Sequence, residues 1–191
     1  VNITRSQLEY ATQRVASHGL SDRITYKLAP ATELPFEDNS FDKVVALESA
    51  FHFQTRAQFF AEAFRVLRPG GRLVLVDMVP LPYDHLSLPK RLMSSLGLHI
   101  WKICKENVYD RETYAQKLRS TGFNARVESI RDTTLVPYAH YAKAELAKPE
   151  RLAKMNYGIA LMIYGPAEVI LDNPWGLMQI DYVLAVADKP K

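Results

Sequence analysis

Residues 65–80 constrain the fold more than any other part of this sequence. They read RVLRPGGRLVLVDMVP. A helical pattern of apolar residues ends near Leu67, and Pro69-Gly70-Gly71 interrupts it because proline and glycine do not continue a helix. The run Leu73 to Val76 is typical of a strand buried on both faces. The segment therefore predicts a helix, a tight turn and a core strand that ends in a carboxylate, Asp77.

Similar patterns along the chain predict an alternation of helices and strands. Apolar residues at helical spacing follow Arg5, and Gly19 suits the end of that helix because glycine tolerates a positive φ. Thr55 and Gln58 have the spacing of a capping box, and Asp110 is typical of a helix N-cap. The predicted helices are residues 5–19, 55–69 and 111–122; the predicted strands are residues 23–29, 43–47, 73–77, 123–130 and 180–190; residues 138–175 have a weakly periodic helical character.

Helices that alternate with short Val- and Leu-rich strands favour an α/β fold, a parallel sheet with helices on both faces. The interval between the strands near Arg126 and Val183 leaves room for a large helical insertion, so the last strand need not run parallel to its neighbours. Sheets of this type bind ligands at the carboxyl ends of their strands. Candidate site residues therefore follow the predicted strands: Asn2, residues 29–34, residues 48–53 and residues 77–80.

Composition and charge limit the number of domains and the kinds of partner that the chain can bind. With 191 residues, 48% of them hydrophobic, the chain can form one domain with a substantial core. The net charge is +3, but the 24 Lys and Arg residues are scattered, so a nucleic-acid surface is not indicated. The apolar runs fall short of the roughly 20 residues that a membrane span needs. We expect a soluble protein that binds neither nucleic acid nor membrane.

Cys104 is the single cysteine, which excludes an internal disulfide and fits a reducing, cytoplasmic compartment. A buried structural thiol is favoured over a nucleophile. The opening residues VNITR lack the apolar segment of a signal peptide, so we expect the sequence to begin within a longer chain.

Four passages together resemble the successive motifs that follow the glycine-rich loop of class I S-adenosylmethionine-dependent methyltransferases. They are ATELPFEDNSFDKVVALESAFHF, FRVLRPGGRLVLVD, YAQKLRSTGF and YVLAVADKP, in the family's order. Within this family, RETYAQKL and SIRDTTLVP resemble the small-molecule O- and C-methyltransferases of natural-product pathways, macrolide sugar O-methyltransferases in particular. The likeness covers nearly the whole chain. Its LPF…FD and LRPGG motifs identify the superfamily far better than the substrate.

The resemblance implies a Rossmann-like α/β sheet, mostly parallel, with strand order 3-2-1-4-5-7-6 and an antiparallel last strand. Asn2 would then end strand two, so strand one and its glycine-rich loop would lie before Val1 and are missing from this sequence. Residues 1–191 would form a single domain with helical lid segments at about 80–107 and 138–175. The implied cofactor is S-adenosylmethionine, and the implied acceptor is a small molecule such as a natural-product or sugar hydroxyl. The resemblance leaves open whether the chain forms a homo-oligomer.

The residues that the resemblance assigns to the cofactor follow strands two, three and four. Asn2 replaces the acidic residue that usually holds the ribose hydroxyls, and an amide can also hydrogen bond to a diol. Pro30 stands where many members have an aspartate, which leaves adenine recognition to the backbone at Ala31 and Thr32. Leu34 would form an apolar wall for adenine or pack under a turn. The cofactor-binding set is Asn2, Ile3, Ala31, Thr32, Leu34 and Glu48.

Methyl transfer to a hydroxyl needs orientation and a base for the hydroxyl proton. His52 follows strand four and has a suitable pKa, so we expect it to be that base; a core or gate histidine is the alternative. Asp77 would orient His52 or the acceptor, or else cap the following turn. Phe51 and Phe53 would contact the acceptor, and Glu48 would meet the amino group of the cofactor or the acceptor. No metal site is predicted.

Rival classes find less support in the sequence. DNPW at residues 172–175 is similar to a motif of amino-directed nucleic-acid methyltransferases, but it lacks the second proline and precedes the last strand, so we interpret it as a turn. A nicotinamide-dependent enzyme would need Gly-x-Gly-x-x-Gly after a strand, which this sequence does not contain. The alternative from another class is a catalytically silent methyltransferase-like domain that acts as a binding or scaffold partner.

Overall fold

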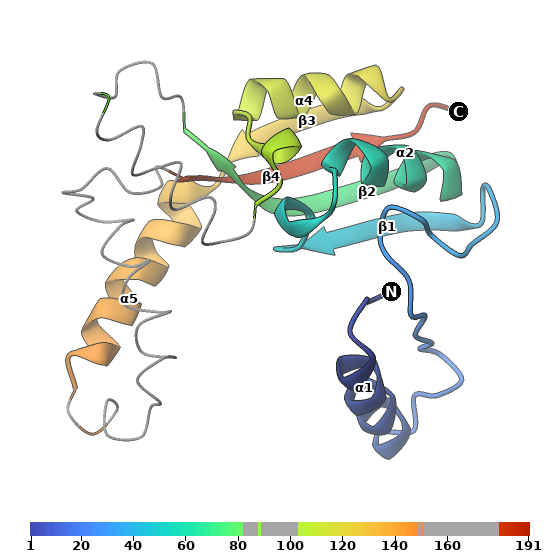
Figure 1. The fold of residues 1–191 in the computed structure, drawn as a ribbon, viewed down its shortest axis with the longest axis horizontal. Coiled ribbons are helices and arrows are strands. Elements are labelled where there is room, and N and C mark those ends of the chain that lie inside the picture. The colour runs from blue at the N-terminus through green and yellow to red at the C-terminus, as the bar shows by residue number, and fades with distance from the viewer. Residues whose placement is uncertain (82–87, 89–102, 149, 151–179) are drawn as a thin grey trace.

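The computed structural model describes residues 1–81, 88, 103–148, 150 and 180–191, and Figure 1 shows how their elements are arranged. The elements are α1 (Arg5–Ser17), β1 (Phe41–Leu47), η1 (Ala50–His52), α2 (Arg56–Val66), β2 (Leu67–Pro80), η2 (Lys105–Asn107), α4 (Arg111–Ser120), β3 (Asn124–Ser129), η3 (Arg131–Leu135), α5 (Val136–Leu146) and β4 (Ile180–Asp188).

The strands form one mixed sheet in the order β1-β2-β4-β3. β1 and β2 are parallel, with Leu47 opposite Val76, whereas β4 runs antiparallel to both β2 and β3. The long interval before β4 allows this reversal, as the sequence indicated. The expected fold class is confirmed: the order corresponds to strands 4-5-7-6 of the implied sheet, and the last strand is antiparallel.

β2 differs from its prediction at both ends. It begins at Leu67, immediately after α2, and includes Pro69-Gly70-Gly71 instead of following a separate turn. The Gly70 N–H donates to the carbonyl of Lys189 at 3.0 Å, with a φ of +79° that suits glycine. At the other end, Asp77 lies within the strand, opposite Val183, and is not at its tip. The pairing with β4 carries β2 three residues further, to Pro80.

The core lies between the sheet and two helices that pack on one of its faces, α2 and α4 (Figure 1). The core side chains come from both helices and from alternate positions of β1, β2 and β4: Ala46, Phe59, Phe60, Ala63, Leu73, Leu75, Tyr114, Leu118, Val183, Ala185 and Ala187. On the opposite face, Val45 and Leu47 are 70% and 66% exposed. Helices were expected on both faces; among the described elements, these two cover one face.

The predicted strand at residues 23–29 is wrong. In the described part of the chain, this segment forms a single parallel bridge, Leu28 with Asn2. A strand requires a partner along its length, and Asn2 is the one residue that pairs with it here. The helix before it is confirmed, because α1 ends at Ser17 and Gly19 has a φ of +66°.

Three further expectations concern the remaining segments. Cys104 is half-buried and its thiol donates to the Glu106 carboxylate at 2.6 Å, so the expectation of a buried thiol is wrong. Most of the expected lid segments, residues 82–87, 89–102 and 151–175, lies outside the described residues. No helix in the described part of the chain is long and apolar enough to span a membrane.

Asp110 provides a test of how α4 begins. Its carboxylate accepts a hydrogen bond from the Thr113 N–H at 2.9 Å, as the N-cap prediction requires. We expect Asp110→Ala to lower the free energy of unfolding by about 1 kcal/mol at pH 7. The exposed Asp132 is the control: Asp132→Ala should change stability by less than about 0.5 kcal/mol.

The effect of Asp110→Ala should also depend on pH. The hydrogen bond from Thr113 lowers the pKa of the Asp110 carboxyl in the folded state. The difference in stability between wild type and variant should therefore be complete above the ordinary aspartate pKa and disappear as the pH falls through the lower folded-state value. Urea denaturation at several pH values measures this, and a difference that is constant down to pH 2 would contradict the assignment.

Candidate functional site

A buried ion pair joins α2 to β2 near the carboxyl ends of β1 and β2. Nε of Arg56 donates to Oδ2 of Asp77 at 2.8 Å, and the side chains are 1% and 0% exposed. Asp77 also accepts hydrogen bonds from the Phe51 N–H at 3.2 Å, the Met78 N–H at 3.0 Å and the Tyr114 hydroxyl at 3.2 Å. Burial raises the pKa of Asp77, and the Arg56 guanidinium, the Met78 N–H and the Tyr114 hydroxyl oppose the rise.

The other hydrogen bonds of Arg56 extend this cluster to the segment before α4. Nη2 donates to the Met78 carbonyl at 2.6 Å, and Nη1 donates to the carbonyl of Asn107. The backbone N–H of Arg56 donates to Oδ1 of Asn107 at 2.8 Å. The guanidinium lies over the rings of Tyr109 and Tyr114, 5.2 and 5.3 Å from their centroids. The buried guanidinium thus has hydrogen-bond or ring partners from β2, from the segment before α4 and from α4.

The same cluster holds the turn that carries His52. Asp77 accepts from the N–H of Phe51, and Nδ2 of Asn107 donates to the carbonyl of Phe53 at 2.9 Å. His52 lies between these two anchored residues, on the surface, with its ring centroid 4.0 Å from that of Phe51. Partial burial lowers the pKa of His52, and the nearby Asp77 carboxylate opposes this shift. His52 is therefore an exposed imidazole on a fixed turn that favours its neutral, proton-accepting form.

The structure corrects two features of the predicted site. Asp77 was expected to orient His52 or the acceptor, but its carboxylate accepts hydrogen bonds from Arg56, Tyr114 and two backbone amides. Asp77 is fully buried, so it does not face an acceptor and is a structural residue beneath the turn. Phe51 is only 3% exposed and belongs to the interior, whereas Phe53 is half-buried against Phe59.

Glu48 lies at the carboxyl end of β1, four residues before His52. Its backbone has a φ of +46°, and its N–H donates to the carbonyl of Val76 at 2.8 Å. Its carboxylate accepts a hydrogen bond from the hydroxyl of Tyr182 on β4. Glu48 and His52 are both exposed at this edge of the sheet, so the structure brings together two of the predicted site residues.

The first two predicted cofactor residues, Asn2 and Ile3, lie just before α1. Oδ1 of Asn2 accepts from the Thr4 N–H at 2.9 Å, and Nδ2 donates to Oε1 of Gln7 at 2.8 Å. The side chain of Asn2 therefore has local partners at the helix N-terminus. Ile3 is 74% exposed beside it. A large exposed apolar side chain next to a polar amide is a surface on which a flat ring can pack.

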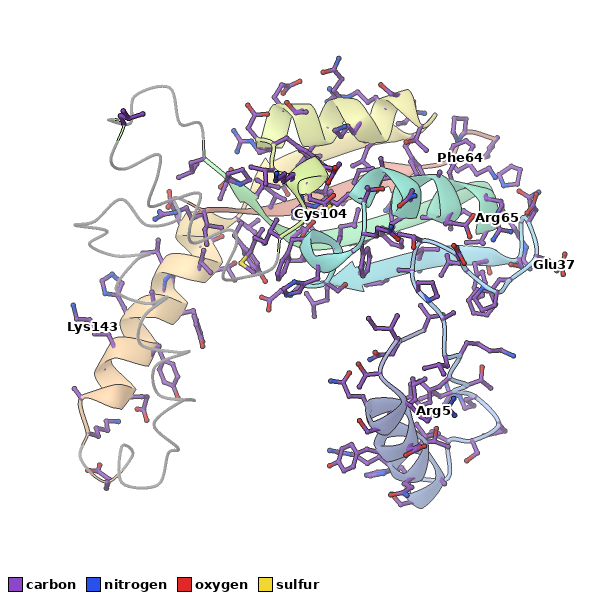
Figure 2. All side chains as sticks on the ribbon, viewed as in Figure 1. Arg5, Glu37, Phe64, Arg65, Cys104 and Lys143 are labelled. Atoms are coloured by element: carbon purple, nitrogen blue, oxygen red, sulfur yellow. The ribbon has the colours of Figure 1, made fainter. Side chains whose placement is uncertain are left out.

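The other predicted cofactor residues lie on a loop that α2 holds in place. Ala31, Thr32 and Leu34 are half-buried. Glu62 accepts from the Leu34 N–H at 2.7 Å, and Arg65 donates to the Leu34 carbonyl at 2.9 Å. Figure 2 shows Arg65 at the end of α2, beside the turn that carries Glu37. The hydrogen bond from Arg65 lowers the pKa of Glu62, so both charges are present at neutral pH to anchor the loop.

Sequence reasoning missed Arg56, Asn107 and Tyr182. Arg56 had a detectable signal, since it lies three and four positions before Phe59 and Phe60 and so shares the apolar face of the helix. Asn107 and Tyr182 had none, because their partners are 51 or more residues away in the sequence. Among the described residues, no group of three or more His, Cys, Asp or Glu side chains is arranged to hold a metal ion.

The chain is similar to known proteins in both its sequence and its fold. A family model for a methyltransferase domain matches residues 1–75. The chain is 35% identical to erythromycin 3''-O-methyltransferase of Saccharopolyspora erythraea, over all of this chain and 63% of that protein. It is 44% identical to 27-O-demethylrifamycin SV methyltransferase of Amycolatopsis mediterranei, over 43% of this chain and 30% of that protein. The chain thus spans less than two thirds of the length of these relatives.

Solved structures share the fold at lower identity. Phosphoethanolamine N-methyltransferase 2 of Haemonchus contortus, in complex with S-adenosyl-L-methionine, matches with a TM-score of 0.77 and 21% identity, over 99% of this chain and 42% of that one. A geranyl diphosphate methyltransferase in complex with the same cofactor matches with a TM-score of 0.73 and 22% identity, over 98% and 66%. At this identity the likeness concerns the fold.

The buried ion pair generates a stability prediction. Asp77→Asn should lower the free energy of unfolding by about 3–5 kcal/mol, because it leaves the Arg56 guanidinium buried without its counter-charge. The matched control is Asp188→Asn in the exposed pair with Arg72, whose side chains are 43% and 52% exposed. That change should cost about 0–1 kcal/mol. Chemical denaturation measures both. Similar losses for the two variants would show that the buried pair contributes no more to the free energy of unfolding than the exposed pair does.

Proposed function

We propose a methyl-transfer function for this chain, which belongs to the family of S-adenosylmethionine-dependent methyltransferases. The observation that supports the proposal most directly is His52, an exposed imidazole of lowered pKa on a turn fixed at both ends by buried residues. A neutral imidazole at the carboxyl end of a strand can take a proton from an acceptor hydroxyl. Glu48, exposed on the same edge, supplies a second polar group.

S-adenosylmethionine is the cofactor we propose, and when bound it supplies a methyl group activated on a sulfonium. The described residues fit its adenosine part: Ile3 offers an exposed apolar side chain, and the loop of Ala31, Thr32 and Leu34 is anchored by α2. Asn2 would reach the ribose through the remaining lone-pair capacity of Oδ1. The sequence contains no Gly-x-Gly run, so the residues that would cradle the methionine part are not among these 191.

The acceptor we propose is a hydroxyl of a sugar or another natural product. This rests on the 35% identity to erythromycin 3''-O-methyltransferase along the whole chain. His52 would receive the hydroxyl proton on a ring nitrogen as the oxygen becomes methylated, and would then release it to solvent. The acceptor would lie over the exposed edge formed by Glu48 and His52, with Phe53 as part of its apolar wall.

A catalytically silent binding domain is the alternative to the proposed methyl transfer. Cofactor titration separates the two. We expect residues 1–191 alone to bind S-adenosylhomocysteine weakly, and the full-length protein to bind it well if its further residues supply a glycine-rich loop. Calorimetry of both proteins measures the difference. Tight binding by residues 1–191 would show that the missing loop is not needed, and no binding by either would favour the silent domain.

The assignment of His52 as the base is tested in the full-length protein. His52→Gln should reduce kcat by roughly 10²–10⁴, the range typical for loss of a general base, with little change in cofactor affinity. The probe is 3''-O-demethylerythromycin with S-adenosylmethionine. His18→Gln, which changes an exposed histidine at the C-terminal end of α1, is the control and should behave as wild type.

The pH profile gives a second test of the same assignment. Because burial lowers the pKa of His52, its neutral form should persist below the ordinary histidine pKa of 6.5. The kcat/KM of the wild type, which reports the free enzyme, should therefore rise with pH through a midpoint below 6.5 and be flat above it. His52→Gln should lose this limb. A midpoint above 6.5, or a limb that survives in the variant, would assign the titration to another group.

A further inference from the structure

Glu48 has a backbone conformation that its residue type does not favour. Among the described residues, only Asn39 and Glu48 combine a positive φ with a side chain, at +53° and +46°. Asparagine tolerates the left-handed region comparatively well, whereas glutamate does so at a steric cost. Strained residues of this kind cluster at functional sites, where the surrounding structure holds them in place. A glutamate at this strand end therefore needs either a structural contact or a function that offsets the strain.

Tyr182 is the residue that holds the Glu48 side chain. Tyr182 is only 5% exposed and lies on β4, opposite Met78 of β2. Since β2 separates β1 from β4 in the sheet, the hydrogen bond from the Tyr182 hydroxyl to Oε1 of Glu48 reaches across a whole strand. Burial and the adjacent carboxylate raise the pKa of Tyr182, so its hydroxyl stays a donor at neutral pH.

The contact directs an exposed carboxylate to the edge that carries His52. A carboxylate offers about four lone-pair sites, so one hydrogen bond from Tyr182 leaves capacity for ligand donors. Tyr182 interacts with the carboxylates of both Glu48 and Asp77, and Asp77 is paired with Arg56 and acts on His52. With Asp77 neutralised by Arg56, Glu48 is the exposed anion of this group.

We propose that Tyr182 is a positioning residue that orients Glu48, and that Glu48 accepts a hydrogen bond from a second hydroxyl of the acceptor, next to the one that is methylated. The proposal rests on the proposed function and adds a specificity requirement to it: the acceptor is a polyol, such as a sugar, and not a lone phenol or alcohol. If the Tyr182–Glu48 contact were purely structural, every substitution that breaks it would lower the stability of the fold.

The test uses the full-length protein and three variants. Tyr182→Phe removes only the hydroxyl, Glu48→Gln removes only the charge, and Glu48→Gly removes both the carboxylate and the backbone strain. Tyr109→Phe is the matched control, because the Tyr109 hydroxyl is buried without a hydrogen-bond partner in the described part of the chain. For each protein, KM and kcat are measured with 3''-O-demethylerythromycin, S-adenosylhomocysteine affinity by calorimetry, and Tm by thermal melting.

We expect Tyr182→Phe and Glu48→Gln to raise KM for the macrolide about tenfold, the effect of losing a hydrogen bond to a charged group, with unchanged cofactor affinity. Tyr109→Phe should match wild type. Glu48→Gly should melt at or above the wild-type Tm, since glycine adopts a positive φ without strain. A loss of cofactor affinity with unchanged KM would overturn the proposal by assigning Glu48 to the cofactor.

A wrong acceptor assignment would give a different set of results from a wrong role for Glu48. If the wild type binds the cofactor but does not methylate the macrolide, the proposed acceptor is wrong, and the melting curves then decide the role of Glu48. A Glu48→Gly protein that is as stable as wild type supports a residue kept for a ligand. A Tm that falls in Glu48→Gly as far as in Tyr182→Phe, and further than in Tyr109→Phe, shows a structural contact and overturns the proposal.

Discussion

The buried Arg56–Asp77 pair is the interaction on which the rest of this structure depends. Removing two charges from water costs several kcal/mol for each ion, and their attraction compensates only when the remaining donors and acceptors are also satisfied. Here the partners come from the turn after β1, from β2, from η2 and from α4. All of these segments must therefore be in place together. The carboxyl end of the sheet consequently has one geometry, and the turn that carries His52 is part of it.

Most of the fold could be predicted from the sequence, because its signals are local. The Asp110 cap and the glycine at position 19 act within a few residues, and both appear in the structure as expected. The apolar run from Leu73 to Val76 does form a strand, but Val74 and Val76 are only half-buried and the strand is longer than predicted. The strand at residues 23–29 failed for a physical reason. Its alternation of apolar residues indicates which side chains share a face, but a strand also needs a neighbour, and alternation carries no information about whether one is present.

The candidate site was predictable in position and only partly in detail. Glu48 and His52 both follow β1 directly, so their position at the carboxyl end of that strand follows from local sequence. The burial of Asp77 was not foreseen, because its environment is made by side chains 21 and 37 residues away in the sequence. From sequence alone, a carboxylate after an apolar run is as consistent with an exposed catalytic group as with a buried structural one. The distinguishing clue is the arginine on the apolar face of α2, since a buried cation requires a buried anion.

The ion pair also bears on the proposed role of His52 as a base. A carboxylate close to an imidazole stabilises the imidazolium, so an unpaired Asp77 would raise the pKa of His52 and keep it protonated near neutral pH. In this structure the charge of Asp77 is matched by Arg56 and spread over four hydrogen bonds. Its pull on His52 is therefore weak, and partial burial prevails in lowering the pKa. If His52 is the base that we propose, Arg56 would act on the chemistry indirectly. It neutralises the anion beneath the turn, so the imidazole above it would stay free to accept a proton.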